Sequence, residues 1–314
     1  MSPVKPLVRL IILFAVGCSP KQSTTEDHST SDDTGSPDDG LTIDTGDTNE
    51  TASLVPKADI IAGWGHTCLL SDEGDLSCWG YNQHGATDVP PIEVARLTGG
   101  HLNTCAIKSD GTLACWGYNL DGESTPPHGT YTSVDSGGDH TCALSRVGEI
   151  HCWGGLNEYQ QLETPNGYYT SVVGGWFHAC ARTVDGYPRC WGANGQGQSS
   201  PPHVWVSSLG SAYWSTCGIQ SDGTLICWGS GIHGQTDPPE GKYTAVSGGE
   251  FHHCAIREDG AVLCWGRNDF GQCDPPDEPF STISLGGIHS CGMTTSGQWR
   301  CWGDDQYGAL APTR

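Results

Sequence analysis

The chain is poor in basic residues and in several large apolar ones. Only 14 Lys and Arg stand against 36 Asp and Glu, a formal net charge of −22, and there are two Met and five Phe. Because phosphate binding needs clustered Lys and Arg, this composition argues against nucleic acid as a partner. The 45 Gly and 19 Pro interrupt the chain too often for long helices. Twelve Trp and ten Tyr remain to fill a core, so we expect a turn-rich, mostly β protein.

A short apolar run, Leu10 to Val16, follows Lys5 and Arg9 at the N-terminus. It is too short to span a bilayer and is typical of the apolar part of a signal peptide. The run ends in Ala15-Val16-Gly17-Cys18, which resembles the bacterial lipobox, although Ala15 replaces the usual Leu. The resemblance implies a lipoprotein signal peptide over residues 1–17 and a lipid on Cys18. An ordinary signal peptide with an incidental cysteine is the alternative.

Ser19 follows that cysteine, where an Asp would indicate retention at the inner membrane. The lipobox resemblance therefore implies an exported protein, anchored by its lipid to the bacterial outer membrane or cell surface. Residues 18–54 are rich in Ser, Thr, Asp and Gly, and from residue 19 on they hold nine acidic residues and one basic residue. Such a stretch cannot bury enough apolar surface to fold, and we predict a disordered acidic linker. Calcium binding is the alternative, but no full EF-hand spacing is present.

Fifteen further cysteines show a repeat. Fourteen of them form seven pairs whose members are ten residues apart, and the pairs recur every 37 or 38 residues. The pairs are Cys68-Cys78, Cys105-Cys115, Cys142-Cys152, Cys180-Cys190, Cys217-Cys227, Cys254-Cys264 and Cys291-Cys301. Cys273 is left over, and we expect it to be a free thiol. A fixed period of this length indicates a repeat architecture over residues 55–314.

Each cysteine pair encloses a turn with glycine in its third position, as in Ser109-Asp110-Gly111. A three-residue hairpin loop needs such a glycine, because its last residue has a left-handed conformation. Centring the loop on Asp110 pairs Ile107 with Leu113 and Cys105 with Cys115. Opposed cysteines could hold zinc or form a disulfide. Zinc needs four converging ligands, and no Cys-x-x-Cys is present, so we predict one disulfide per hairpin and no metal site.

Two more residues recur with the cysteines. Every second cysteine is followed by Trp-Gly, and five units have His two residues before the first cysteine. A Trp in every unit favours packing between neighbouring sheets over a binding cage. The His-x-Cys pattern could suggest a catalytic dyad, but its repetition favours a histidine that ties one unit to the next. We predict no catalytic residue and no cofactor.

The complete unit is best seen at Gly174–Gln198 and Gly248–Gln272. It resembles the repeat of the regulator of chromosome condensation family, and the short units are similar to those of compact bacterial relatives that include a secreted β-lactamase inhibitor. The resemblance implies an all-β fold, a seven-bladed β-propeller of about 37 residues per repeat over residues 55–314. The third repeat departs most, with Tyr159 where Gly is expected and one extra residue before Cys180.

Fold alone does not give function in this family, which includes exchange factors, inhibitors, lectin-like binders and scaffolds. We expect a non-enzymatic, monomeric module that binds a protein partner and reaches the membrane through its lipid anchor only. A glycan-binding propeller is the alternative, and an inhibitor or exchange-factor-like regulator is a more remote one. Exchange activity would require a cytosolic GTPase, which disagrees with the export signal.

The binding face is expected where the units differ. The loop before each His and the loop after each Trp-Gly should lie at one end of the blades, opposite the glycine turns. Residues in the first loop vary from unit to unit, as expected of a repeat scaffold that builds one asymmetric surface. The predicted binding residues are Trp64, His101, Leu102, Trp176, Phe177, Tyr213, Trp214, Phe251 and Ile288. The alternative is that these rings only cover the channel and the blade ends.

Overall fold

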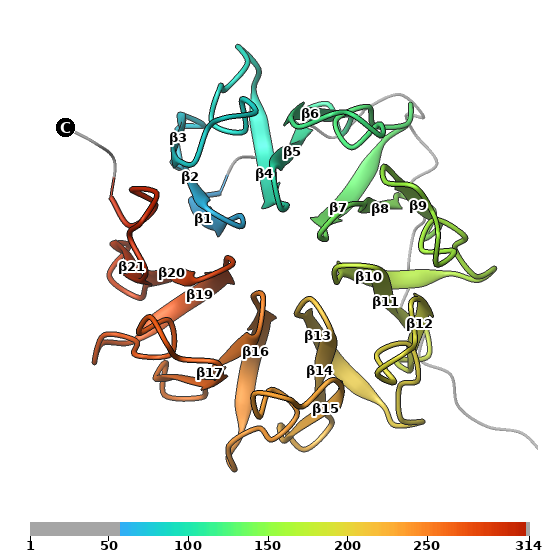
Figure 1. Ribbon diagram of the computed structural model, residues 1–314, viewed down its shortest axis with the longest axis vertical. Coiled ribbons are helices and arrows are strands. Elements are labelled where there is room, and N and C mark those ends of the chain that lie inside the picture. Colours follow the sequence, from blue (N-terminus) through green and yellow to red (C-terminus); the bar gives the residue numbers. More distant parts are fainter. Residues whose placement is uncertain (1–56, 312–314) are drawn as a thin grey trace, which may run out of the picture. The chain divides into compact units, whose positions relative to one another are not determined.

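The computed structural model describes residues 57–311, which form seven three-stranded antiparallel sheets arranged radially as the blades of a propeller (Figure 1). The strands are β1 (Asp59–Ala62), β2 (His66–Leu70), β3 (Leu76–Gly80), β4 (Val94–Gly99), β5 (Asn103–Lys108), β6 (Leu113–Gly117), β7 (Tyr131–Ser136), β8 (Thr141–Ser145), β9 (Ile150–Trp153), β10 (Tyr169–Gly174), β11 (His178–Thr183), β12 (Pro188–Gly192), β13 (Val206–Ser211), β14 (Ser215–Gln220), β15 (Leu225–Gly229), β16 (Tyr243–Gly248), β17 (His252–Arg257), β18 (Val262–Gly266), β19 (Phe280–Leu285), β20 (His289–Thr294) and β21 (Trp299–Gly303). The predicted all-β propeller with seven repeats is confirmed.

The predictions for the N-terminal part lie outside the described residues. These are the signal peptide over 1–17, the lipidated Cys18 and the acidic linker over 18–54. Within residues 57–311, no helix has the length and apolar character needed to cross a membrane.

Each blade is built from three strands that follow one another in the chain. The first strand lies nearest the axis, the second forms the middle, and the third is outermost (Figure 1). The segment after the third strand contains Pro-Pro in five blades. Because proline cannot donate to a ladder, this segment adds no fourth strand.

The hairpin between the middle and outer strands has the predicted register. In the second blade Cys105 lies opposite Cys115, and Ile107 lies opposite Leu113. All seven cysteine pairs are joined as disulfides, and Cys273 is free. The third turn residue, such as Gly111 with φ 85°, is left-handed in every blade. The turn assignment is therefore confirmed.

Replacing one of these turn glycines by valine is expected to destabilise the protein. The variants Gly111→Val, Gly223→Val and Gly260→Val place a β-branched residue at positive φ, which costs roughly 1–2 kcal/mol. Gly195→Val is the matched control, because Gly195 is not left-handed and a Cβ there meets no atom within 4 Å. Thermal melts should show a lower midpoint for the three turn variants than for the control. Equal midpoints for all four would contradict the turn assignment.

The recurring Trp packs between blades, as predicted. Trp116 of the second blade is 8% exposed and clusters with Ile61 and Leu70 of the first blade. Its indole Nε1 donates to the carbonyl of Ala86, 30 residues earlier, at 2.9 Å. The same bond recurs, at 2.9–3.1 Å, from Trp153 to Glu123, Trp191 to Gln161, Trp228 to Gln198, Trp265 to Gln235 and Trp302 to Gln272.

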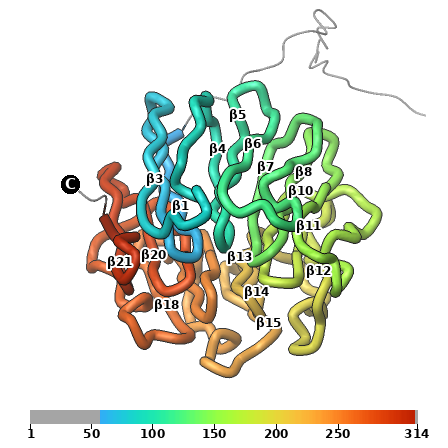
Figure 2. The backbone as a smooth tube through the Cα atoms, turned by 45° about the horizontal axis from the view of Figure 1, so that its top comes forward, coloured from blue at the N-terminus to red at the C-terminus, as the bar shows by residue number. Residues whose placement is uncertain are grey.

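The seventh bond of this series closes the ring. Trp79 of the first blade donates to the carbonyl of Ala309, near the C-terminal end of the described chain, at 2.9 Å. The first and last blades stand side by side (Figure 2), and the Ala62 amide donates to Ser284 Oγ at 2.9 Å. No strand is exchanged between the first and last sheets. The segment around Ala309 therefore accepts the indole hydrogen bond of the first blade. In each other blade, the segment that precedes the blade provides this acceptor.

The repeated histidines tie neighbouring blades together. All five are buried, and the Nε2 atoms of four of them lie 2.9–3.0 Å from a hydroxyl of the next blade: His66 with Thr104, His178 with Thr216, His252 with Ser290 and His289 with Thr67. In the fifth blade the two groups are exchanged, and Ser215 Oγ lies 3.0 Å from His253 Nε2. The predicted linking role is confirmed for these four. His140 differs because Ala179 stands where the next blade would supply the hydroxyl, and its Nε2 has no partner among the described residues.

A glycine three residues before each histidine lets the ring lie flat on the backbone. A Cβ on Gly63 would overlap the His66 ring, and a Cβ on Gly175 would overlap the His178 ring. The fifth blade has Ala212 at this position, and there the residue three positions later is the small Ser215 instead of His. The glycine therefore makes room for a larger side chain three residues later, which is His in five blades and Asn103 in the second.

The third repeat corrects one detail of the sequence analysis. Gln160, not Tyr159, stands at the glycine position, because its neighbour Gln161 accepts from Trp191 as Gln198 does from Trp228. Gln160 takes the left-handed conformation with φ 62°, close to the value of 82° at Gly197. The extra residue lies between Trp153 and Asn157, since Asn157 Oδ1 accepts from the Leu162 amide in the same way as Asn194 Oδ1 accepts from Ser199.

Candidate functional site

The two ends of the blades differ in chemistry. At one end the residue after Trp-Gly donates its amide to the carbonyl of the residue before the histidine position, as Tyr81 does to Gly65 and Ala193 does to Phe177. These two loops therefore lie together, as predicted, and we call this the cap end. The glycine turns lie at the other end of the same strands, which we call the turn end.

A continuous network of rings lies at the cap end, and we call it the aromatic cap. Its members are Trp64, Tyr81, His101, Trp176, Phe177, Tyr213, Trp214, Phe251 and Tyr307. Neighbouring centroids are 4.5–6.4 Å apart, with Trp176 and Tyr213 the closest pair. The network runs from the C-terminal segment through blades one, two, four, five and six.

Seven of the nine predicted binding residues belong to the aromatic cap. The other two, Leu102 and Ile288, lie in the same loops but make no ring contact, and their carbonyls accept from Tyr118 and Asp304. All nine side chains are half-buried. The cap is thus neither part of the cores between blades nor fully exposed, and it both covers the channel and presents a surface.

The sequence analysis missed part of this surface. Tyr81 and Tyr307 contact Trp64 from the loops that follow Trp-Gly, with centroid distances of 5.7 and 5.2 Å. The tips of other such loops expose apolar side chains, namely Leu120, Leu156, Tyr159, Ile232 and Phe270. The sequence does indicate these residues, because it places the loop after Trp-Gly at the same end as the loop before the histidine position.

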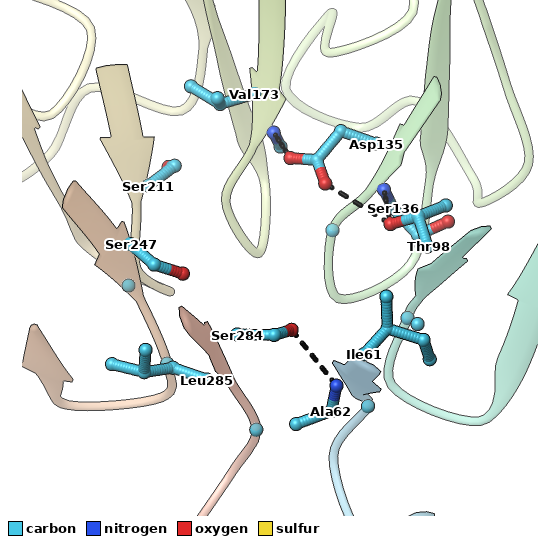
Figure 3. A pocket seen from close by; sticks show the side chains of 18 of the residues that line it. Ile61, Ala62, Thr98, Asp135, Ser136, Val173, Ser211, Ser247, Ser284 and Leu285 are labelled. Carbon is cyan, nitrogen blue, oxygen red and sulfur yellow. Dashed lines mark hydrogen bonds between the residues drawn. The ribbon is translucent and has the colours of Figure 1, made fainter. Parts of the chain in front are cut away.

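A central channel of about 300 Å³ is lined by the inner strands of all seven blades. Trp64, His101 and Tyr213 of the aromatic cap line its mouth at the cap end. Further along it, Figure 3 shows mostly small side chains, among them Ser247 and Ser284. The inner strands therefore place the cap directly over the channel.

Asp135 is one of two carboxylates that line this channel, with Asp59. Its Oδ2 accepts from the Gly174 amide at 2.8 Å and its Oδ1 accepts from Thr98 Oγ1 at 3.2 Å (Figure 3). Burial raises its pKa to about 6, while these two hydrogen bonds act in the opposite direction. Because its partners belong to the fourth and second blades, Asp135 connects three consecutive blades.

Burial acts on two reactive groups of the described residues, the Ser211–His178 pair and the Cys273 thiol. Ser211 Oγ lies 3.3 Å from His178 Nε2, but burial lowers the pKa of that histidine to about 3, too low for an effective base at neutral pH. Within residues 57–311 no cluster of three or more His, Cys, Asp or Glu could hold a metal ion. The Cys273 thiol donates to the Arg267 carbonyl, and burial raises its pKa to about 12. Such a thiol is a poor nucleophile.

A second exposed apolar group lies at the turn end of the fourth blade. It includes Tyr168, Val184, Tyr187 and Trp205, all exposed. Tyr187 packs edge-to-face on His203 at 4.6 Å, and Arg182 lies 5.2 Å from the Trp205 ring. This group is smaller than the aromatic cap and lies at the opposite end, so it provides a matched control for experiments on the cap.

Four stretches of the chain match the family model described as the Regulator of chromosome condensation (RCC1) repeat, namely residues 58–86, 131–161, 169–198 and 243–272. They fall in blades one, three, four and six. The fold is also that of Prp20p from Saccharomyces cerevisiae, with a TM-score of 0.63 and 18% identity over 73% of this chain and 80% of that one. The chain is an RCC1-type repeat propeller.

Two plant structures share the RCC1-type fold. The ectodomain of the receptor kinase CR4 from Physcomitrella patens has a TM-score of 0.69 and 26% identity, over 78% of this chain and 72% of that one. The CRINKLY WD40 ectodomain of the receptor kinase ACR4 from Arabidopsis thaliana has a TM-score of 0.70 and 24% identity, over 81% and 98%. No curated protein matches the chain. The RCC1-type fold indicates a protein-interaction module, and seven disulfides are typical of exported proteins.

Proposed function

We propose that this RCC1-type propeller is a non-enzymatic protein-binding module, held at the bacterial surface by a lipid on Cys18, with the aromatic cap as its binding face. The observation that carries the proposal is the cap itself. Nine different rings form one network at a single end of an otherwise repeated frame. Clustered aromatic side chains are the residues that most often dominate binding energy at protein interfaces.

The backbone beneath the cap supports this role. The Trp64 amide donates to the Gly100 carbonyl at 3.0 Å, and the Trp176 amide donates to the Tyr213 carbonyl at 3.0 Å. These bonds connect the loops of different blades and fix them before any partner arrives. A fixed surface loses less conformational entropy on binding than a mobile one, which favours affinity.

The described chain begins at the end of the blades opposite the cap. The Ala58 amide donates to Asp72 Oδ1 in the turn of the first blade at 2.9 Å, so the described chain begins at the turn end. The cap therefore lies at the other end of the blades from Ala58. The likeness to CR4, the ectodomain of a receptor kinase, supports display outside the cell. Prp20p, described with binding properties to Gsp1p and histones, is similar in fold alone and adds nothing about the partner.

Removal of two cap rings is expected to abolish partner binding. Trp176→Ala with Trp214→Ala removes the rings at the centre of the network, and we expect the affinity for a partner captured on intact cells to fall about 100-fold or more. The variant should stay folded at room temperature with a lower midpoint of thermal unfolding, because it loses five ring pairs that contribute about 0.5–1.5 kcal/mol each.

The control for this test is Tyr187→Ala with Trp205→Ala, which removes two exposed rings at the turn end. Its partner affinity should equal that of the wild type. Unchanged binding in the cap variant, or a collapse of its stability, would show that the cap rings only pack and that the binding site lies elsewhere.

The anchoring part of the proposal predicts a mature N-terminus at Cys18 that carries a lipid. Mass spectrometry of the N-terminal peptide from the protein purified from membranes decides this. An unlipidated N-terminus downstream of Cys18 would remove the anchor from the proposal while leaving the binding face untouched.

A glycan ligand is the second candidate, because Trp176 and Phe177 stack at 5.6 Å with an interplanar angle of 25°. Flat aromatic surfaces of this kind also pack against sugar rings. A glycan array probed with wild type and the cap variant separates the two. Specific glycan signals that disappear in the variant would favour a lectin over a protein-binding module.

A further inference from the structure

The mouth of the central channel has an acceptor that the fold does not use. The Tyr213 hydroxyl is buried and has no hydrogen-bond partner among the described residues. The ring lies between Trp176 on one side, at 4.5 Å, and Phe251 on the other, at 6.4 Å. A buried hydroxyl without a partner is costly unless a ligand satisfies it.

One acidic residue lies close to Tyr213. The Tyr213 amide lies 3.3 Å from the Glu250 carbonyl, and the partly buried Glu250 carboxylate accepts from the Trp64 indole and acts electrostatically on Tyr213. Asp135 lies further along the same channel. Arg267 acts on Glu250, but its Nε is paired with Asp269 Oδ2 at 2.6 Å. The mouth therefore has ring faces with one carboxylate close by, which is the chemistry that attracts a cation.

The chain already shows this chemistry at the rim. The Arg267 guanidinium lies over the rings of Phe251 and Phe270, 6.0 and 5.5 Å from their centroids. The mouth next to it is lined by Trp64, His101 and Tyr213 and leads into about 300 Å³ of space. This is about ten times the volume that one water molecule occupies in the liquid, so a long side chain has room to enter.

We propose that the channel mouth receives one cationic side chain, the guanidinium or ammonium group of an Arg or Lys, from the protein partner. This inference rests on the proposed function and adds the chemistry of the partner to it. The cation packs between the rings, donates to the Tyr213 hydroxyl and is neutralised by Glu250. The formal net charge of −22 also steers a basic segment towards this protein.

The test uses the full chain and two small probes of equal shape, butylguanidinium and its neutral counterpart butylurea. Titration followed by tryptophan fluorescence and calorimetry should show saturable binding of butylguanidinium and binding of butylurea that is at least about tenfold weaker, since hydrogen bonds to charged groups contribute about 1.5–3 kcal/mol. Glu250→Gln should weaken butylguanidinium binding by about tenfold, and Tyr213→Phe should weaken it severalfold.

Asp185→Asn is the matched control, because it removes the same charge from an exposed position at the turn end. It should leave the affinity for butylguanidinium unchanged. If Glu250→Gln does not fold, as judged by its melt, Tyr213→Phe decides, since it keeps the ring and removes only the hydroxyl.

Three results would overturn the inference: no saturable binding of butylguanidinium, equal binding of both probes, or equal losses in Glu250→Gln and Asp185→Asn. The proposed function fails separately. Loss of the cation site with continued dependence of partner binding on Trp176 and Trp214 would leave the cap as the binding face and remove only the cationic anchor.

Discussion

Reduction of the seven disulfides is expected to unfold the propeller. Each disulfide closes a hairpin of eleven residues, a constraint worth roughly 2–3 kcal/mol in the chain-entropy model. Even if these seven contributions add only in part, their sum is comparable with the free energy of unfolding of a typical protein, about 5–15 kcal/mol. The reduced chain should therefore lack a stable fold at room temperature.

The first cysteine of each pair is fully buried and the second is half-buried, so unfolding the chain makes all seven disulfides accessible to a reductant. The measurement is to reduce and alkylate the protein in denaturant, remove the denaturant and record near-ultraviolet circular dichroism. We expect the signal of packed Trp to be absent. Cys273→Ser should fold normally, and thiol titration of the unfolded, unreduced wild type should return one group. A native spectrum of the alkylated protein would show that the disulfides are dispensable.

Acidification is expected to cause the second large loss of stability. Burial lowers the pKa of five interblade histidines, to about 3 for His66, His178 and His252 and to about 4 for His253 and His289. The hydroxyl groups bonded to these histidines explain why the neutral imidazole is required. Thr67 Oγ1 donates to the Ala309 carbonyl at 2.8 Å, so it can only accept from His289 Nε2. A second proton would then sit on Nδ1, which has no partner among the described residues.

The sign follows from the direction of these shifts. A histidine whose folded pKa lies below its unfolded value of about 6.5 contributes fully above pH 6.5, and the contribution is lost as the pH falls towards the folded pKa. Asp135, with a folded pKa raised to about 6, acts in the opposite direction, as do Asp59 and Glu250, whose pKa values burial also raises. These are three groups against six histidines, since burial lowers the pKa of His101 as well. From pH 7 to pH 5 we expect several kcal/mol of net loss and a midpoint lower by about 10–20 °C.

The control for this prediction comes from the second blade, where Asn103 takes the histidine position. His178→Asn should lower stability at pH 7, since the bond to Thr216 is lost, and should reduce the pH dependence by about one proton. Melts at intervals between pH 7 and pH 4 measure both. A midpoint that does not change over this range would contradict the requirement for neutral histidines.

The repeat made most of the fold predictable. Period, hairpin register, disulfide pairing and the packing of Trp116 and its counterparts all follow from local spacing, because each unit contains its own turn and its own contact to the next. The position of Gln160 did not follow, since a non-glycine residue in the left-handed conformation carries no sequence signal. The closure of the ring through Ala309 was also unforeseen, because it joins residues 230 positions apart.

The candidate site was predictable in position but not in content. Sequence placed the variable loops at one end and named Trp64, Trp176 and Tyr213. It also placed the loops of Tyr81 and Tyr307 at that end, but it could not show that both rings contact Trp64, because that contact depends on how the first and last blades pack. Nor could it show that the Tyr213 hydroxyl is unpartnered or that Glu250 lies beside it, since both depend on the packing of loops from different blades.

The most direct test of the aromatic cap as the binding face is amide hydrogen exchange of the full chain with and without its captured partner. We expect slower exchange with partner in the cap-end loops, residues 63–65, 175–177 and 212–214, and no change in the turn-end loops, residues 109–111 and 184–187. Protection confined to the turn end around Val184 and Tyr187, with the cap-end loops unchanged, would contradict the assignment of the cap as the binding face.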